Sequence, residues 1–283
     1  MILNHSGPFD LKSTLLSGQA FRWRAEDGWF KGVISGNIVW LKETPYGIEF
    51  MAGPEKDSVL EPKLKNYLGL NTDLEALYTS MSFDHRLKEA ISRHHGMRIL
   101  AQDPWECLIS FICSSASNIS RITNNIESLC TTFGNEIFMD GYMRHTFPTP
   151  VELAESTTQS LRNLGLGYRA DYIVSTARMI ASGHTDLMAL HEMPYDEALE
   201  QLTFLNGVGD KVANCVLLFS LDKPEAFPVD TWIDKALRKW YLGDSKISRK
   251  NMRLWAMAYF GECAGYANHY LFHDQRLLES LKN

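Results

Sequence analysis

At residues 205–212 the chain reads Leu205-Asn206-Gly207-Val208-Gly209-Asp210-Lys211-Val212, a Gly-x-Gly turn between two segments of helical periodicity. Glycine tolerates positive φ, so such a turn lets two helices reverse direction tightly. It also leaves the first amides of the next helix without partners, and these form an anion site suited to a backbone phosphate. A weaker echo, Leu164-Gly165-Leu166-Gly167, lies upstream. Taken alone, either turn is better explained as an ordinary helix–helix connection.

Two residues after the second glycine, Lys211 occupies the first turn of an almost wholly apolar helix predicted for residues 212–221. The positive helix end and the apolar neighbours both favour a neutral amine over an ammonium, and a neutral amine is a nucleophile. Asp230 follows 19 residues later, at the N-cap of the next predicted helix. The spacing allows both groups to face one cleft. As isolated residues, a surface lysine and a structural cap explain them better.

The first part of the chain, up to about residue 53, has the pattern of β structure. Strand-like runs at residues 29–34 and 38–42 flank Ser35-Gly36-Asn37, which has the composition of a turn. A third run, residues 48–51, follows Thr44-Pro45-Tyr46-Gly47, which is again typical of a turn. We expect an antiparallel sheet with one solvated face.

From about residue 57 the apolar period becomes helical. Asn118 is placed as an N-cap for residues 119–133, and three prolines stand where first helical turns begin, namely Pro104, Pro150 and Pro194. The predicted fold class is α+β, an N-terminal antiparallel β-sheet domain followed by an all-helical body. The predicted domains are residues 1–95, β-rich with flanking helices, and residues 96–283, which hold the turn and the cleft.

Composition excludes several classes of protein. Of 283 residues, 45% are hydrophobic, and 28 basic against 34 acidic residues give a net charge of −6. The chain is not a globally basic nucleic-acid binder, so any DNA binding must rest on local chemistry. The longest apolar stretch is shorter than the ~20 residues that a membrane span needs, and the N-terminus lacks the features of a signal peptide. We expect a soluble intracellular protein.

The cysteine and histidine patterns argue against metal and disulfide chemistry. Five cysteines are odd in number and contain no Cys-x-x-Cys pair, namely Cys107, Cys113, Cys130, Cys215 and Cys263. A disulfide scaffold, a structural zinc site and an iron–sulfur cluster are therefore not expected. No His-Glu-x-x-His motif occurs among the nine histidines. We expect no catalytic metal and no other cofactor.

Four motifs, in order, resemble the 8-oxoguanine DNA glycosylases, a branch of the helix-hairpin-helix base-excision glycosylases. They are Ser17-Gly18-Gln19-Ala20-Phe21-Arg22-Trp23, Gln102-Asp103-Pro104 through Phe111-Ile112-Cys113-Ser114-Ser115, Leu164-Gly165-Leu166-Gly167-Tyr168-Arg169-Ala170, and the turn at 205–212 with Phe227-Pro228-Val229-Asp230. The resemblance spans residues 9 to about 275. It implies the helix-hairpin-helix fold and a bifunctional DNA repair enzyme. Such an enzyme flips 8-oxoguanine out of duplex DNA, excises it through a lysine Schiff base and cleaves the strand by β-elimination.

The resemblance assigns roles to residues in the cleft. Lys211 matches the family's lysine nucleophile, and Asp230 matches the aspartate that stabilises the cationic sugar. Gly18 matches the residue whose backbone carbonyl accepts the N7–H of 8-oxoguanine, a hydrogen that guanine lacks. The remaining base-contacting positions are matched by Cys215 and Phe272, which sandwich the flipped purine, and by Asn268 at its Watson–Crick edge.

Further matches concern the duplex. Tyr168 resembles the family's wedge in the opened base stack, and Arg121 and Arg169 match arginines that read the cytosine opposite the lesion. The hairpin that grips a phosphate contains Gly207 and Gly209. The resemblance also implies a structural monovalent or calcium ion on three of its backbone carbonyls, those of Thr203, Leu205 and Val208. The expected partner is duplex DNA containing 8-oxoguanine, bound by a monomer, with no membrane and no obligate protein partner.

Three positions depart from the family's pattern. Ala116 stands where eukaryotic members usually have an asparagine that touches the opposite cytosine, so we expect a relaxed preference for the opposite base. Asn268 is shorter than the usual glutamine, and Trp232 replaces a histidine that donates to a phosphate. The reaction type is therefore better determined than the fine specificity.

Two alternative functions remain open from the sequence. One is a helix-hairpin-helix glycosylase for other damaged bases, although alkylpurine members typically lack a lysine at the position of Lys211. The other is a non-catalytic module that binds DNA structure through the hairpin alone. In either case the expected location is the cytoplasm, with the nucleoid, in a bacterium, or the nucleus in a eukaryote.

Overall fold

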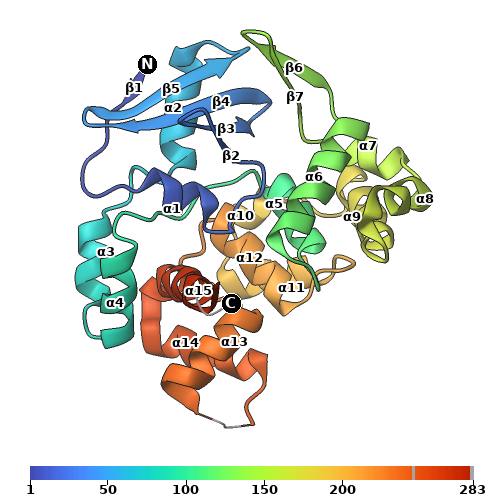
Figure 1. Cartoon of the computed structure of the whole chain (residues 1–283). Coiled ribbons are helices and arrows are strands. Elements are labelled where there is room, and N and C mark those ends of the chain that lie inside the picture. Colours follow the sequence, from blue (N-terminus) through green and yellow to red (C-terminus); the bar gives the residue numbers. More distant parts are fainter. Residues whose placement is uncertain (244–245, 281–283) are drawn as a thin grey trace.

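The computed structural model describes residues 1–243 and 246–280, and its N-terminal part is an antiparallel sheet (Figure 1). The sheet order is β1-β5-β4-β3-β2. The strands are β1 (Ile2–Leu3), β2 (Arg24–Glu26), β3 (Trp29–Ile34), β4 (Asn37–Thr44) and β5 (Gly47–Gly53). The three strand runs predicted from the sequence are confirmed as β3, which has the predicted bounds, and as β4 and β5, which are each three residues longer than predicted.

One face of this sheet is closed by helices α1 (Leu11–Leu16) and α2 (Asp57–Tyr67). Asp10 caps α1, because its side chain accepts a hydrogen bond from the amide of Ser13. Apolar side chains from the sheet and both helices form one buried cluster, which includes Leu3, Leu15, Val39, Phe50 and Leu64. Burial of this cluster anchors the loop that follows α1, and that loop carries Gly18.

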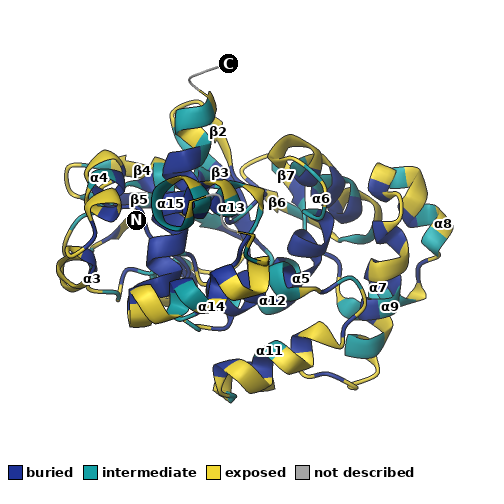
Figure 2. Cartoon of the chain, turned by 90° about the horizontal axis from the view of Figure 1, so that it is seen from below, coloured by how far each residue is buried: buried dark blue, intermediate teal, exposed yellow. Residues whose placement is uncertain are grey.

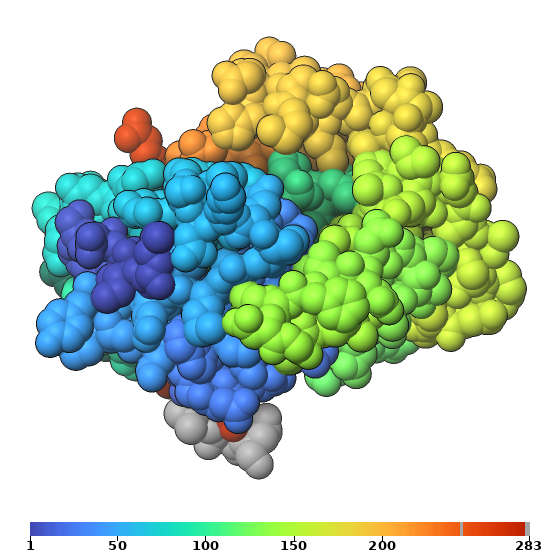
Figure 3. Space-filling view, turned by 90° about the horizontal axis from the view of Figure 1, so that it is seen from above, coloured from blue at the N-terminus to red at the C-terminus, as the bar shows by residue number. Residues whose placement is uncertain are grey.

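The opposite face of the sheet carries a feature that the sequence pattern missed. A hairpin of β6 (Glu136–Met139) and β7 (Tyr142–His145) extends from the helical body. The ring of Tyr142 packs edge-on against Trp40 of β4, with 5.5 Å between centroids. Figure 3 shows the hairpin, in green, lying against the sheet, in blue. The body is therefore helical apart from this hairpin, which joins it to the sheet.

The rest of the described chain is helical, as predicted. The helices are α3 (Leu74–Met81), α4 (His85–Arg93), α5 (Pro104–Cys113), α6 (Ile119–Phe133), α7 (Pro150–Glu155), α8 (Thr158–Leu161), η1 (Arg162–Leu166), α9 (Arg169–Ala181), α10 (Ala189–Glu192), α11 (Tyr195–Thr203), α12 (Asp210–Ser220), α13 (Thr231–Leu237), η2 (Arg238–Leu242), α14 (Arg249–Phe260), η3 (Gly261–Cys263) and α15 (Ala264–Ser280). Asn118 caps α6 through the amide of Arg121, and Pro104 and Pro150 begin α5 and α7.

Two buried clusters hold these helices together. One joins α5, α6, α9, α11 and α12, and the other joins α3 and α4 to α13, α14 and α15. Tyr78 of α3 is hydrogen-bonded to Tyr270 of α15 at 2.8 Å, and Arg93 of α4 forms an ion pair with Asp274 at 2.7 Å. Helices α3 and α4 thus pack with the C-terminal helices, although the predicted boundary at residue 95 places them in the front domain. That boundary stays a prediction.

Burial distinguishes the central helices from the outer ones. Figure 2 shows α15 dark blue along much of its length, whereas α11 has an exposed face. All five cysteines are buried and free. Among the described residues, no helix combines the length and the apolar character that crossing a membrane requires.

Candidate active site

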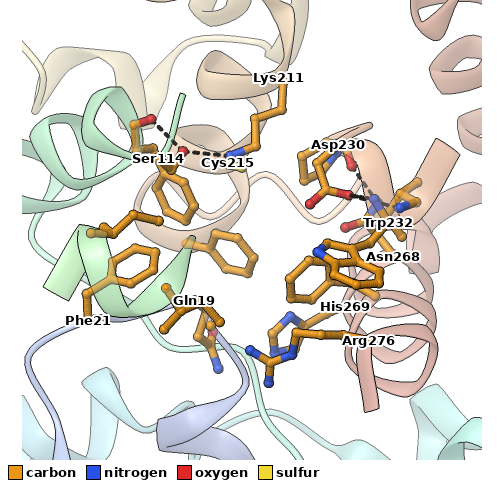
Figure 4. Close-up of a pocket in the computed structure, with 18 of the residues that line it drawn as sticks. Gln19, Phe21, Ser114, Lys211, Cys215, Asp230, Trp232, Asn268, His269 and Arg276 are labelled. Atoms are coloured by element: carbon orange, nitrogen blue, oxygen red, sulfur yellow. Dashed lines mark hydrogen bonds between the residues drawn. The ribbon is translucent and has the colours of Figure 1, made fainter. Parts of the chain in front are cut away.

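A cavity of about 370 Å³ lies where the loop after α1 meets α5, α12, α15 and the start of α13. All six residues predicted to catalyse or to bind the base line this one cavity, namely Gly18, Lys211, Cys215, Asp230, Asn268 and Phe272. Figure 4 shows Lys211 and Asp230 reaching into it from neighbouring elements. Segments more than 200 residues apart in the chain therefore converge on a space large enough for a purine.

Lys211 lies in the first turn of α12 and is half-buried. Its Nζ donates a hydrogen bond to Oγ of Ser114, the residue that ends α5, at 2.8 Å. The same Nζ lies 4.8 Å from the centroid of the Phe111 ring, which stacks on Phe219 at 5.6 Å. The amine therefore has a polar contact on one side and an aromatic face on the other.

Ser114 has a fixed hydrogen-bond polarity. Its hydroxyl donates to the backbone oxygen of Phe111 at 2.6 Å, and a hydroxyl has only one hydrogen to give. Its oxygen must therefore accept from Lys211. Ser114 belongs to the second of the four family motifs, but no local pattern around it indicates a role in the reaction.

Asp230 caps α13, as predicted. One carboxylate oxygen accepts the amides of Trp232 at 2.9 Å and Ile233 at 2.8 Å. Burial raises the pKa of this carboxyl above its ordinary value, while the two amide hydrogen bonds and the charge of Lys211 oppose the rise. The carboxylate is thus held rigidly at the edge of the cavity, close enough to Lys211 to interact electrostatically.

The predicted base-contacting residues form the walls of the cavity. Cys215 follows Lys211 by one helical turn, and burial raises the pKa of its thiol to about 11, against the influence of Lys211. Gly18 has φ +98°, and a β-carbon there would lie 3.5 Å from Phe272. Asn268 is buried, and its amide nitrogen donates to the backbone oxygen of Pro228 at 2.9 Å.

The Gly-x-Gly turn joins α11 to α12, as the pattern predicted. Gly207 has φ +80°, and a β-carbon on it would lie 2.6 Å from Tyr172, so only glycine fits there. Gly209 is the N-cap of α12 and makes no side-chain capping bond, while the space around it is open. The turn therefore presents the first amides of α12 without a side-chain cap.

The three side chains predicted to contact the duplex, beside the two glycines of the turn, differ in exposure. Arg121 is exposed, and Tyr168 is 51% exposed. Arg169 is buried, and its guanidinium donates to the backbone oxygens of Ser115 and Ala116. Contact of Arg169 with the opposite cytosine stays a prediction, and it requires these carbonyls to release the guanidinium.

Arg276 and His269 also line the cavity, and the sequence reasoning missed both. They lie on α15, on the same helical face as Phe272, which follows His269 by three residues and precedes Arg276 by four. That spacing was the available signal, because residues four apart on a helix reach the same surface. Among the described residues, no cluster of three or more His, Cys, Asp or Glu side chains is arranged to hold a metal ion.

The fold and the cavity together define a base-excision DNA glycosylase of the helix-hairpin-helix class. Residues 109–259 match the HhH-GPD superfamily of base excision DNA repair proteins. Residues 1–108 match the 8-oxoguanine DNA glycosylase N-terminal domain. The chain belongs to the 8-oxoguanine DNA glycosylase family of N-glycosylase/DNA lyases, so the predicted family and enzyme class are confirmed.

Individual relatives agree with this assignment. The chain is 34% identical to a probable N-glycosylase/DNA lyase of Methanothermobacter thermautotrophicus, over 98% of this chain and 97% of that one. It is 36% identical to the N-glycosylase/DNA lyase of Saccharomyces cerevisiae, over 86% and 71% of the two chains. The Clostridium acetobutylicum 8-oxoguanine glycosylase/lyase, solved with dsDNA containing cytosine opposite 8-oxoG, superposes with a TM-score of 0.92 at 31% identity, covering 96% and 93%.

Proposed function

We propose that Lys211 is the nucleophile with which this N-glycosylase/DNA lyase removes 8-oxoguanine from duplex DNA. The observation that carries the proposal is that Lys211 and Asp230 line one cavity together with Gly18, Cys215 and Phe272. A stacked base cannot reach such a cavity, so the damaged nucleotide must first be flipped out of the duplex.

In the first step, the Nζ lone pair of Lys211 attacks C1′ of the flipped deoxyribose, and the bond between C1′ and N9 breaks. The bonding electrons leave with the base, which takes up a proton, and the attached amine loses one. Opening of the C1′–O4′ bond then gives a Schiff base between Nζ and C1′. Loss of a C2′ proton expels the 3′-phosphate by β-elimination, and hydrolysis of the imine regenerates the lysine.

Ser114 and Asp230 support this reaction in different ways. Ser114 accepts one N–H of Lys211, so this hydrogen bond leaves the lone pair of the reacting amine unused and available for attack. Asp230, held by two backbone amides, places negative charge where the sugar becomes cationic as the glycosidic bond breaks. This electrostatic role needs no proton transfer.

Recognition of the oxidised base rests on the cavity walls. The backbone carbonyl of Gly18 accepts the N7–H of 8-oxoguanine, whereas N7 of guanine is an acceptor and is repelled. Phe272 and Cys215 lie on either face of the flipped purine. The neutral thiol of Cys215 suits this contact because it is small and apolar.

The hairpin and its neighbours grip the duplex. The uncapped amides of α12 beside Gly209 bind a phosphate, and the exposed Arg121 and Tyr168 contact the opened duplex. A structural cation fits the neutral carbonyl oxygens of Thr203, Leu205 and Val208. The oxygen of Leu205 accepts one bond, from the amide of Val208 at 3.1 Å, which leaves it a second lone pair. Local groups of this kind explain DNA binding by a chain of net charge −6.

Borohydride trapping on a duplex containing 8-oxoguanine tests the proposal. Reduction of the Schiff base is expected to give a covalent protein–DNA adduct with the unaltered chain and with Lys88→Gln, an exposed lysine of α4. Lys211→Gln is expected to give no adduct and no base release, while its affinity for the lesion changes little. Normal base release by Lys211→Gln would show that the nucleophile is a different group. Tight binding by the unaltered chain, without adduct or strand cleavage, would show a DNA-binding module instead.

A further inference from the structure

Arg276 of α15 projects into the base cavity beside Gly18. Its Nη1 lies 3.1 Å from the position that a β-carbon on Gly18 would occupy. Its guanidinium carbon lies 5.6 Å from the centroid of the Phe272 ring, one helical turn earlier. Figure 4 shows Arg276 and Lys211 on opposite sides of the cavity, with Arg276 reaching toward Gln19. A cationic donor thus stands across the cavity from the proposed nucleophile.

The contacts of Arg276 fix one half of the guanidinium. Nη2 donates to the backbone oxygen of Leu16 at 3.2 Å and lies 3.2 Å from Nδ1 of His273. Burial lowers the pKa of His273 to about 3, so this imidazole is neutral and accepts through Nδ1. Asp274, two residues earlier on the same helix, is already paired with Arg93 at 2.7 Å. Both polar contacts of the guanidinium given above are made by Nη2, whereas Nη1 lies on the Gly18 side of the cavity.

A flipped base that reacts at C1′ must enter the cavity with its sugar edge toward Lys211. The six-membered ring of the purine, with position 6, then lies at the far end. Position 6 is adjacent to the C5–N7 side of the base, and N7–H is the group assigned to the carbonyl of Gly18. The donor beside Gly18 therefore faces the substituent at position 6. That substituent is a carbonyl in oxidised guanine and an amino group in oxidised adenine.

Asn268 is oriented to accept from the base rather than to donate to it. One N–H of its amide nitrogen donates to the backbone oxygen of Pro228 at 2.9 Å, and this bond places the amide oxygen on the side away from Pro228. An oxygen there suits the N–H groups of a guanine Watson–Crick edge, but it would repel O6. A buried carbonyl without a donor costs free energy, so O6 needs a donor from another residue.

We propose that Arg276 is a specificity-determining residue that donates from Nη1 to O6 of the flipped base. This inference rests on the proposed function, because it needs a base seated with its sugar toward Lys211. The class of ligand that it selects is the oxidised 6-oxopurine. An oxidised 6-aminopurine presents N–H donors at this position, and these are repelled by the guanidinium.

Three duplexes, each carrying a single lesion, test this assignment: one 8-oxoguanine, one 8-oxoadenine and one abasic site. Single-turnover rates are measured for the unaltered chain, for Arg276→Leu and for Arg276→Lys. Arg276→Leu is expected to release 8-oxoguanine about ten- to hundredfold more slowly, as for loss of a hydrogen bond to a charged group. Its ratio of 8-oxoguanine to 8-oxoadenine release falls by about the same factor. Cleavage of the abasic site changes little, because no base occupies the cavity.

The controls separate specificity from folding and from the proposed function itself. Arg276→Lys keeps the charge and is expected to retain an intermediate ratio, and Arg86→Leu on the exposed side of α4 is expected to keep the full ratio. An unchanged ratio in Arg276→Leu would overturn the inference alone, as would equal release of both bases by the unaltered chain. Failure of the unaltered chain to release either base or to form a trapped adduct would overturn the proposed function as well.

Discussion

The base cavity and the loop of residues 114–118 meet at Ser114, yet they use their polar groups in opposite ways. In the cavity, Lys211 and Asp230 are each anchored by hydrogen bonds and still face the open space. In the loop, the guanidinium of Arg169 donates its hydrogen bonds to the backbone oxygens of Ser115 and Ala116. The groups proposed for the reaction are in place before DNA arrives, whereas one group predicted to read the opposite strand is bound within the protein.

This difference separates two kinds of function within one site. Excision needs groups fixed in advance around C1′, since preorganised charges stabilise a transition state without reorganising. Reading the opposite base through Arg169 requires the loop to change its hydrogen bonds first. Substitutions in the cavity should therefore alter rates by orders of magnitude, and substitutions in the loop should alter selectivity by small factors.

After Lys211→Gln, which should abolish base release, Asp230→Asn gives the largest expected effect. Removing the negative charge should slow single-turnover release of 8-oxoguanine by about 10²–10³-fold, the size of losing one electrostatic transition-state contact. Asparagine is as good an N-cap as aspartate, so the melting temperature should change little. Asp230→Ala, which removes the cap as well, should lose about 1 kcal/mol of stability. A fall in melting temperature of Asp230→Asn as large as that of Asp230→Ala would mean that the rate loss reflects folding.

The pH profile sharpens the same comparison. Burial raises the pKa of Asp230 above its ordinary value. As the pH is lowered, the excision rate should therefore begin to fall at a pH above the range in which an ordinary aspartate is protonated. The fall should then be about tenfold per pH unit. Protonation at this site favours the folded state, since the folded pKa is the higher one. The loss therefore cannot arise from unfolding driven by Asp230. The excision rate of Asp230→Asn, measured over the same pH range, should not show this decrease at low pH.

Ser114→Ala tests the point where the two regions meet. The amine of Lys211 loses its hydrogen bond to a side-chain hydroxyl, so formation of the trapped adduct should slow by about tenfold. Ser114→Thr keeps a hydroxyl and should recover most of the rate. The preference for the opposite base should not change, because the loop uses backbone oxygens of Ser115 and Ala116. Failure of threonine to rescue the rate would show that the serine acts through packing.

The features that could be predicted from the sequence alone are those that depend on a few neighbouring residues. The Gly-x-Gly turn, Lys211 and the cap at Asp230 are local patterns, and each forms as predicted because its physics is confined to a few neighbouring residues. The strands of the sheet follow from alternation and turn composition for the same reason. Local patterns assign these residues to helices and turns, and the four family motifs indicate that those helices and turns form one site.

The features that were missed depend on contacts between distant segments. The partner of Lys211 is Ser114, 97 residues away, and no periodicity links the two. The hairpin at 136–145 is short and half polar, and it is stabilised by packing on Trp40 of the sheet. Arg169 reads as a surface arginine, and its burial is set by the carbonyls of a loop more than 50 residues upstream. Tertiary contacts of this kind leave little trace in local composition.

Ala116→Asn gives the smallest expected effect and acts on the loop alone. Ala116 has φ +48°, a left-handed conformation that asparagine tolerates better than alanine. The substitution should raise the stability by about 0.5 kcal/mol and restore a side chain able to touch the opposite base, so the preference for cytosine should rise by about threefold. Ala116→Gly relieves the same strain without adding a side chain, so it should match the gain in stability and leave the preference unchanged. If both variants gained the same cytosine preference, relief of backbone strain would be the cause, and the loop would act through its conformation.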